Sequence, residues 1–340
     1  MKKYLASVII FGFLFAFTIE ETKAQQLPPI LNIGTSSVGS FQYIAASAVA
    51  TVINKYTPMK ATVKSMGGTT AWYPLITTKD LELGMLNNWE AEKGYLGESV
   101  YMKLTQGKGF PIRLIAIGIW NSIGSVVAAD SGIYKYSDLK GKRVAGNYPT
   151  PSFQLQTEGL LANGGVKWSE IIPVPVSTLA EGIKAVVEGR ADAAGTIRLG
   201  VPLVEELHSK KGARFLPLDP SPEALKRVSE KFPGYPVKVT PGPGNTGVEK
   251  EQYMFAFDDN LIGREDLPDE AVMLIVKALW EHYKDLGSIH VLLKDWIPDR
   301  FVSNKALIPY HPGAIKFYKE KGVWTEEMAK LQEALLAKKK

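Results

Sequence analysis

Cysteine is absent from this 340-residue sequence, and histidine occurs only four times. The absence of cysteine excludes disulfides, thiolate metal sites, cysteine nucleophiles and the lipid-bearing cysteine of a bacterial lipoprotein. It also suits export to an oxidising compartment, where a free thiol is a liability. The four histidines form neither an HxxxH nor an HExxH pair. We therefore expect no metal site and no cofactor.

Concentrated charge of one sign is also missing. The formal net charge is +5, but Lys and Arg are interspersed with Asp and Glu along most of the chain. The only sharp basic run is Lys338-Lys339-Lys340 at the terminus, and no basic stripe alternates with stacking aromatic residues. We therefore expect no nucleic-acid partner. With 45% hydrophobic and 22% charged residues, the composition is typical of a soluble globular protein.

A single long apolar run lies at the N-terminus. Lys2 and Lys3 precede an apolar stretch over residues 5–19, and small residues at cleavage spacing follow, ending at Ala24. The stretch is shorter than the roughly 20 residues that a membrane-spanning helix needs. We therefore predict a signal peptide over residues 1–24, cleaved near Ala24, and release of the mature protein into the periplasm.

Strand patterns alternate with helix patterns along the rest of the chain. The first group comprises predicted strands at 31–34, 62–65, 83–86, 113–119 and 125–129 and a helix at 41–55. The same order then restarts, with strands at 143–145, 172–176 and 191–194 and helices at 153–163 and 179–188. This alternation predicts an α/β fold with a mostly parallel sheet, built as two similar units.

The chain returns to the first unit near its end. Residues 233–247 are rich in Pro and Gly and are predicted to form a loop. After it come a predicted strand at 253–257 and helices at 269–286 and 325–337. We therefore predict lobe 1 from residues 25–120 plus 255–340, and lobe 2 from residues 121–254. Two connecting segments form a hinge, and the interlobe cleft can close over a ligand.

Five stretches of sequence carry a family resemblance. They are Ile33-Gly-Thr-Ser-Ser-Val-Gly39, Gly67-Gly68, Ala129 to Ile133 with Asp138-Leu-Lys-Gly-Lys-Arg-Val144, Glu188-Gly-Arg-Ala-Asp-Ala193, and His311-Pro-Gly-Ala-Ile-Lys-Phe-Tyr318. Together they resemble the TAXI class of solute receptors of tripartite ATP-independent periplasmic (TRAP) transporters. The resemblance implies a type II periplasmic-binding-protein fold. We interpret the His311 run as a structural turn outside the site.

Ligand clefts in such folds lie where strand ends lead into helix N-termini, whose free N–H groups attract carboxylates. The predicted ligand-binding residues are Thr35, Ser36, Ser37, Ser40, Phe41, Gly68, Thr69, Asn87, Asn88, Trp89, Thr150, Ser152, Phe153, Thr196 and Arg198. Each polar residue could instead cap a helix, and Trp89 could pack the hinge. Arg198, predicted just after a strand, either grips a carboxylate through two hydrogen bonds or is exposed or paired in an interlobe salt bridge.

Some of these positions depart from the family pattern. Gln42 stands where Tyr is usual, Asn87-Asn88-Trp89 where Gln-Ser-Asp is more common, and Phe153 where the family has a hydroxyl. Amides and an indole favour hydrogen bonding and stacking on a planar or hydroxylated solute. These departures leave an amino acid, a dicarboxylate or an aromatic acid open as the solute.

The resemblance implies a receptor that carries a small organic anion, a carboxylate, to TRAP permease subunits, and we expect a monomer. A receptor of an ABC importer has the same fold and is the first alternative. A ligand sensor working with a membrane histidine kinase is another. An enzyme on the same scaffold is disfavoured, because the sequence contains no visible nucleophile–base pair, metal cluster or phosphate loop.

Overall fold

The structure is a computed structural model that describes residues 26–36, 38, 40–148 and 150–339. The predicted signal peptide and the predicted ligand residue Ser37 lie outside the described residues. So does the last residue of the basic run, Lys340.

Ten strands form one mixed sheet. Its order is β2-β1-β3-β10-β4-β7-β5-β6, with β8 paired to β4 and β9 paired to β10. The strands are β1 (Ile30–Thr35), β2 (Lys60–Ser65), β3 (Leu83–Asn87), β4 (Ile112–Ala128), β5 (Arg143–Gly146), β6 (Ile172–Pro175), β7 (Ala193–Arg198), β8 (Ala213–Phe215), β9 (Tyr235–Val239) and β10 (Gln252–Arg264). Parallel pairing joins β1 to β2 and β3, and β5 to β6 and β7, whereas β4 and β10 are antiparallel to their neighbours.

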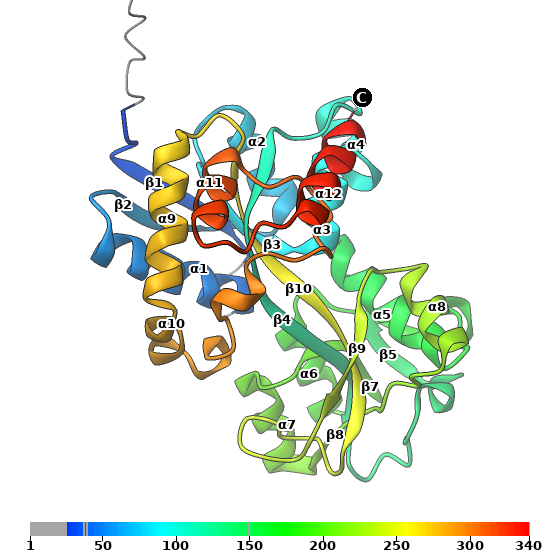
Figure 1. The fold of residues 1–340 in the computed structure, drawn as a ribbon. Helices are drawn as coiled ribbons and strands as arrows, with labels where there is room; N and C mark the ends of the chain where they lie inside the picture. Colours follow the sequence, from blue (N-terminus) through cyan, green and yellow to red (C-terminus); the bar gives the residue numbers. More distant parts are fainter. Residues whose placement is uncertain (1–25, 37, 39, 149, 340) are drawn as a thin grey trace, which may run out of the picture.

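Helices surround the sheet on both sides of a narrow waist (Figure 1). They are α1 (Phe41–Tyr56), α2 (Thr69–Thr77), α3 (Asn88–Leu96), α4 (Met102–Thr105), α5 (Pro151–Asn163), α6 (Leu179–Val187), α7 (Pro202–Lys211), α8 (Pro222–Ser229), α9 (Asp269–Glu281), α10 (Tyr283–Ile289), α11 (Pro312–Glu320) and α12 (Glu326–Ala337). Short 3-10 turns are η1 (Ser99–Tyr101), η2 (Tyr136–Leu139), η3 (Trp168–Glu170), η4 (Val291–Leu293) and η5 (Pro298–Arg300).

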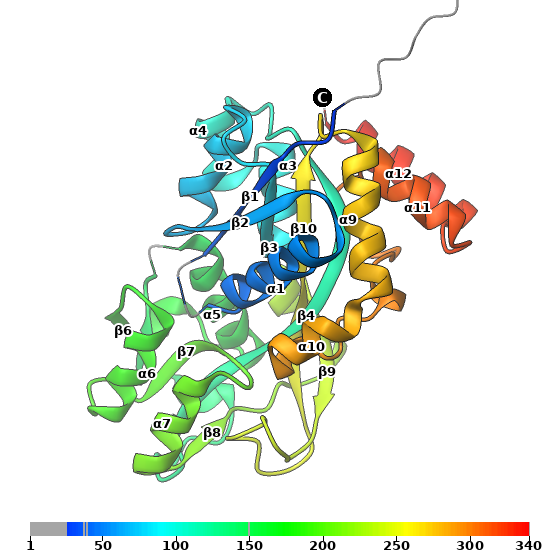
Figure 2. The ribbon, with the colours of Figure 1, turned by 90° about the vertical axis from the view of Figure 1, so that its left-hand side faces the viewer.

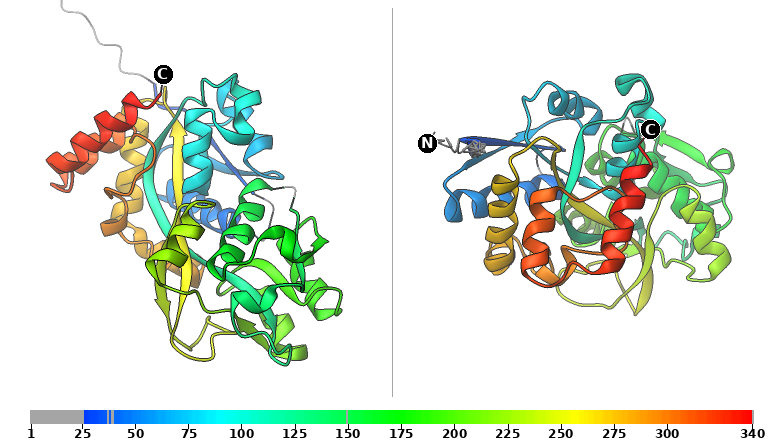
Figure 3. Two further views of the ribbon diagram at one scale, coloured as in Figure 1. Left: turned by 90° about the vertical axis from the view of Figure 1, so that its right-hand side faces the viewer. Right: turned by 45° about the horizontal axis from the view of Figure 1, so that its top comes forward.

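Two lobes are apparent in the ribbon (Figure 1). The upper lobe, called lobe 1 here, carries β1–β3 with α1–α4 and α9–α12, and the lower lobe 2 carries β5–β9 with α5–α8. The long strands β4 and β10 run from one lobe into the other as an antiparallel pair. Helix α10 hangs from lobe 1 beside α1, toward lobe 2 (Figure 2). Helices α11 and α12 lie on the outer side of lobe 1, away from lobe 2 (Figure 3).

The predicted α/β class is confirmed. Several predicted elements differ in extent. The predicted strands at 113–119 and 125–129 are one strand, β4, because the chain stays extended while it crosses between the lobes. The predicted helix at 269–286 is divided into α9 and α10 at His282, whose φ of −121° and ψ of 25° are not helical.

The predicted loop at 233–247 is wrong in part, because it contains strand β9. This strand pairs only with β10, and its Pro236 lies opposite Phe255. An edge strand tolerates proline, since one row of its N–H groups faces away from any partner. The strand predicted at 191–194 also lies further along the chain, as β7. Thr196 and Arg198 therefore belong to this strand and do not follow it.

Candidate functional site

Strand ends and helix N-termini from both lobes meet in the cleft. In lobe 1, β1 leads into α1, β2 into α2 and β3 into α3, while β5 leads into α5 in lobe 2. Contacts that join the lobes across the cleft include a hydrogen bond from the Ser152 hydroxyl to Glu90 Oε1 at 3.0 Å and the Arg198 guanidinium, which lies 3.5 Å from the Phe41 ring centre. The structure is therefore a closed arrangement.

Arg198 is the buried cation of this cleft. The residue is only 7% exposed, and its Nε and Nη1 atoms are buried without a hydrogen-bond partner among the residues that the structure describes. The salt-bridge interpretation of the sequence is therefore wrong for the described part of the chain, and so is simple exposure. Burial lowers the pKa of Arg198 to about 10, and the charge of Asp259 opposes that shift. A guanidinium with a pKa near 10 stays charged at neutral pH, so this residue is a buried cation whose burial costs free energy.

A carboxylate lies near Arg198 at the hinge. Asp259 is fully buried, and its two oxygens accept hydrogen bonds from Gln42 Nε2 at 2.9 Å and Asn121 Nδ2 at 3.1 Å. Burial raises its pKa to about 6, against the two amide hydrogen bonds and the charge of Arg198. Because its Nδ2 donates to the carboxylate, Asn121 must present Oδ1 as an acceptor, and this atom is buried without a partner.

A second buried carboxyl, that of Glu90, lies at the start of α3. Asn87 caps this helix by accepting from the Glu90 N–H at 2.9 Å, and Asn87 Nδ2 donates to Glu90 Oε2 at 3.0 Å. Burial raises the pKa of Glu90 to about 7, and the nearby charge of Asp259 adds to that shift. Hydrogen bonds from Ser152 and Thr69 oppose it. The cleft therefore holds two acids whose charged forms are destabilised.

A small pocket opens between the N-termini of α2 and α5. Its volume is about 240 Å³, and its lining comprises Gly67, Gly68, Thr69, Thr70, Ala71, Thr150 and Pro151. Neither helix has a side-chain hydrogen bond at its N-cap, which is Gly68 in α2 and Thr150 in α5. The first N–H groups of both helices are therefore free of side-chain caps. Two such helix ends facing one pocket suit an anionic group.

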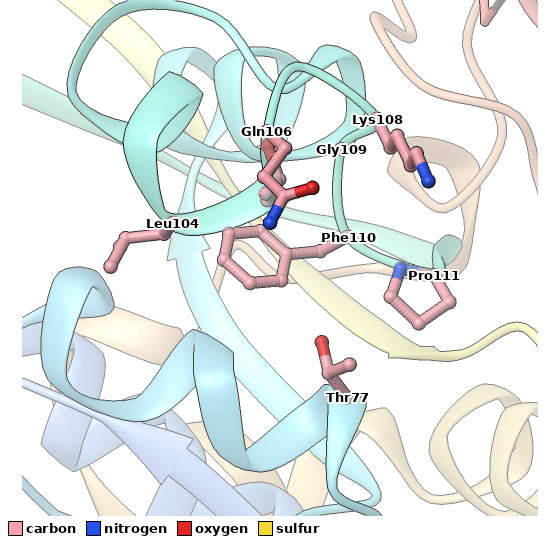
Figure 4. Close-up of a pocket in the computed structure, with 8 residues that line it drawn as sticks. Thr77, Leu104, Gln106, Lys108, Gly109, Phe110 and Pro111 are labelled. Carbon is pink, nitrogen blue, oxygen red and sulfur yellow. The ribbon is translucent and has the colours of Figure 1, made fainter.

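Another pocket, of about 280 Å³, lies in lobe 1 away from the cleft (Figure 4). It is lined by Thr77 at the end of α2, by Leu104 of α4 and by residues of the α4–β4 connection, including Gln106, Lys108 and Phe110. It contains none of the predicted ligand residues and touches only one lobe. The cleft is thus the better candidate site.

The structure brings most of the predicted ligand residues to the cleft, in several roles. Ser40 caps α1 by accepting from the Tyr43 N–H at 3.2 Å, and Thr35 is buried with its hydroxyl unpaired. The hydroxyls of Thr69 and Tyr101 share a 2.5 Å hydrogen bond, and Thr196 donates to Gln156. The Ser36 carbonyl accepts from Ser65, so this residue also connects β1 to β2.

The predicted aromatic ligand residues Trp89 and Phe153 pack against other aromatic side chains. Trp89 is only 5% exposed and stacks on Phe232 at 6.1 Å, which is the hinge-packing alternative. Phe153 packs edge-on against Tyr148. Asn88 is half-buried at the start of α3, and its Oδ1 is buried without a partner.

His311 lies far from this chemistry. It is fully buried and caps α11 by accepting from the Gly313 N–H at 3.1 Å, so it starts a helix where we predicted a turn. Burial lowers the pKa of His311 to about 4. Its structural role is confirmed, and its place outside the ligand site stays a prediction.

Sequence reasoning missed the two cleft acids, Asp259 and Glu90, although it included the Glu90 partners Asn87, Thr69 and Ser152. Asp259 lies in the polar triplet Asp258-Asp259-Asn260 within the otherwise apolar run of β10, and this interruption is a usable signal. Glu90 gave no such signal, because an acid in the first turn of a helix is ordinary. Gln42 was noted as a departure but was not placed in the site.

Metal and membrane features are not found in the described residues. No group of three or more acidic or histidine side chains there could hold a metal ion. Among the described helices, none is both long enough and apolar enough to span a membrane.

Solved structures with the same fold include ligand-binding proteins, and they confirm the predicted type II periplasmic-binding-protein fold. The structure is similar to PhnD1 from Prochlorococcus marinus in complex with methylphosphonate (TM-score 0.54, 13% identity, 87% of this chain and 99% of that chain). It is also similar to the ligand-binding component of an ABC-type import system from Staphylococcus aureus (TM-score 0.51, 11% identity, 91% of this chain and 99% of that chain). A third similar structure is that of a putative periplasmic sulfonate-binding protein, SsuA, from Methylobacillus flagellatus (TM-score 0.51, 13% identity, 91% of this chain and 95% of that chain).

A match to a sequence family covers most of the chain. Residues 33–322 match the family described as the NMT1-like family. This match does not confirm the narrower TAXI class that the motifs resemble. It does include both lobes and every predicted ligand residue from Thr35 to Arg198. The chain belongs to the NMT1-like family.

Proposed function

We propose that this protein is a periplasmic receptor that captures a small organic anion between its lobes and delivers it to a membrane transporter. The single observation that carries the proposal is the unpaired, buried guanidinium of Arg198. An anion between the lobes supplies the acceptors that its Nε and Nη1 lack. Uncapped N-termini of α2 and α5 face the same cleft and add positive potential.

The mechanism is capture by closure of the lobes. Closing the empty cleft leaves a desolvated cation without a partner, which costs free energy. A bound anion removes that cost only in the closed state, so it shifts the population toward closure. We divide the lobes as predicted, at residues 25–120 plus 255–340 and residues 121–254, with β4 and β10 as the hinge. The closed form then docks on the transporter.

For the transporter, we favour an ABC importer over the TRAP permease that the motifs suggest. The solved structures of the same fold that name a transport system name the ABC type. The TRAP assignment rests on the sequence motifs alone, chiefly the glycine loop at 33–39 and the run His311 to Tyr318. We propose capture without catalysis by a monomer, with a carboxylate, sulfonate or phosphonate as the anionic group.

The test is a thermal-shift screen with carboxylates, amino acids, sulfonates and phosphonates, followed by calorimetry of any solute that raises the melting temperature. Arg198→Ala should then weaken binding by about 2 kcal/mol or more, roughly 30-fold in Kd. Arg143→Ala is the matched control, because Arg143 pairs with Asp192 at 2.6 Å on the surface of lobe 2. Equal affinity of wild type and Arg198→Ala would refute the role of Arg198.

A further inference from the structure

Glu90 is a buried carboxyl group that contacts both lobes. It belongs to lobe 1, where α3 begins, and is 5% exposed. Its Oε1 accepts from Ser152, the second residue of α5 in lobe 2. The pocket lined by Gly68, Thr69 and Thr150 lies between the N-termini of α2 and α5, and Thr69 and Ser152 at these two ends also hydrogen-bond with Glu90. Lobe 2 therefore covers one side of this carboxyl group and contributes to its burial.

The groups that face Glu90 offer hydroxyls, an amide and another acid. From α2 come Thr69, which hydrogen-bonds with it, and Tyr73, whose hydroxyl donates to the Glu90 carbonyl at 2.9 Å. Lobe 2 supplies Ser152. The remaining neighbours are Asn87 at the end of β3, Tyr101 of η1, and Asp259 of β10, whose charge disfavours a second anion. Within the described residues, no basic side chain forms an ion pair with Glu90.

A carboxylate without a cation is destabilised when water is removed, and an adjacent negative charge adds to the effect. Its protonated form is neutral and keeps the hydrogen bonds, because a carboxylic acid retains acceptor capacity and gains one donor. The direction of the pKa shift, to about 7 in the closed arrangement, agrees with this argument. In an open arrangement, water replaces lobe 2 against this group, and its pKa is lower.

We propose that Glu90 binds a proton when the lobes close, so that the proton is a second ligand of the closed receptor. The inference rests on the proposed function for its purpose, since it makes solute capture tighter in acid and looser in alkali. Its physical content, proton-linked closure, concerns the protein without solute. It can therefore be tested separately.

The sign follows from the linkage relation. The closed form has the higher Glu90 pKa, so it binds more protons than the open form wherever the pH lies between the two values. Above about pH 8 both forms are deprotonated, and the ratio of closed to open protein is constant. As the pH falls below 7 the ratio rises, by up to about tenfold per pH unit for one linked proton. It levels off again below the pKa of the open form.

The experiment is small-angle X-ray scattering of the solute-free full-length mature chain from pH 5 to 8.5. We expect the radius of gyration to decrease as the pH falls through 7. Glu90→Gln, which carries a neutral group of the same shape, should be compact and pH-independent over this range. Glu98→Gln is the matched control, because Glu98 lies on the surface just after the end of α3 and pairs with Lys93 at 2.8 Å. The radius of gyration of Glu98→Gln should change with pH in the same way as that of the wild type.

A second variant keeps the test decisive if Glu90→Gln does not fold, which circular dichroism will report. The Ser152 hydrogen bond lowers the pKa of Glu90 because it stabilises the deprotonated closed form, so Ser152→Ala should be more open than the wild type at pH 8.5 and nearly as compact at pH 5. The proposal is overturned if the wild-type radius does not change with pH, if Glu90→Gln keeps the wild-type change, or if the radius of Ser152→Ala changes with pH no more than that of the wild type.

Failure of this inference and failure of the proposed function give different results. If no solute raises the melting temperature in the screen but compaction follows Glu90, the receptor proposal fails and the proton site stands. If solutes bind through Arg198 and compaction is independent of Glu90, the receptor stands and the proton site fails. Asp259 also has a raised pKa, of about 6, and Asp259→Asn in the same titration separates its contribution.

Discussion

At the scale of single residues, the cleft separates charge from its usual partners. The Arg198 guanidinium stacks on the Phe41 ring at 3.5 Å, while the oxygens of the nearby Asp259 accept hydrogen bonds from Gln42 and Asn121. Cation–π contact compensates only part of the lost hydration of a guanidinium. A site of this kind is less stable when empty than an apolar one would be, and the difference is available to an anionic ligand.

This reasoning predicts that Arg198→Met stabilises the empty protein. Methionine has a similar length and needs no hydrogen bonds, so removing the unpaired cation should raise the free energy of unfolding by about 1–2 kcal/mol. The measurement is urea unfolding without solute at pH 7. Arg143→Met is the control and should lose stability slightly, since it breaks the ion pair with Asp192. A large loss of stability in Arg198→Met would contradict the argument.

At the scale of elements, close packing of α2 on the sheet positions the Gly68 end of this helix. Trp72 of α2 is fully buried, and its ring occupies the space beside Gly34 of β1 and Gly84 of β3. A Cβ atom on Gly84 would lie 2.5 Å from Trp72 Cη2, closer than any normal contact. Glycine at these positions lets the indole reach the strands, and that sets how near the α2 N-terminus lies to the cleft.

Gly84→Ala should therefore destabilise the fold by about 1–3 kcal/mol, because the buried indole has no free space into which to move. Thermal or urea unfolding measures this loss. Gly67→Ala is the control, since a Cβ there meets nothing within 4 Å and the residue has no left-handed φ. An unchanged stability of Gly84→Ala would show that the helix can shift freely against the sheet.

At the scale of the whole molecule, the hinge strand β10 carries two neighbouring acids that serve different networks. Asp259 binds Gln42 and Asn121 on the cleft side. Asp258 Oδ1 accepts from Tyr235 of β9 and from Arg300 Nη2, each at 2.8 Å. Successive residues of a strand point to opposite sides, so the second network lies behind the hinge. It connects a strand of lobe 2 to the C-terminal part of lobe 1.

Tyr235→Phe should lower the free energy of unfolding by about 1.5–3 kcal/mol, the usual contribution of a hydrogen bond to a charged group. Asp258 would keep Arg300 but lose one of its two donors. Urea unfolding of the whole chain is the measurement. The control is Tyr253→Phe on the adjacent strand β10. The Tyr253 hydroxyl forms no hydrogen bond with the residues that the structure describes. Equal losses in the two variants would mean that the network behind the hinge contributes nothing specific.

The amino-acid sequence by itself determined the α/β class, the order of most strands and helices, and the families of loops that line the cleft. These follow from local periodicity, helix caps such as Ser40 and turn residues, which act over a few neighbouring positions. Residues such as Thr35, Thr69, Asn87 and Ser152 could be predicted for the same reason. They lie where a strand pattern ends and a helix pattern begins.

Only the tertiary structure decided which side chains lack partners. Arg198 could equally have been paired or exposed, and Glu90 resembled any acid in a first helical turn. Their state depends on Phe41, Ser152 and Asp259, which are distant in sequence and meet only when both lobes are assembled. Burial and the distances between charged groups are properties of that assembly, and they set the cost of an unpaired charge. Local sequence patterns carry no information about either.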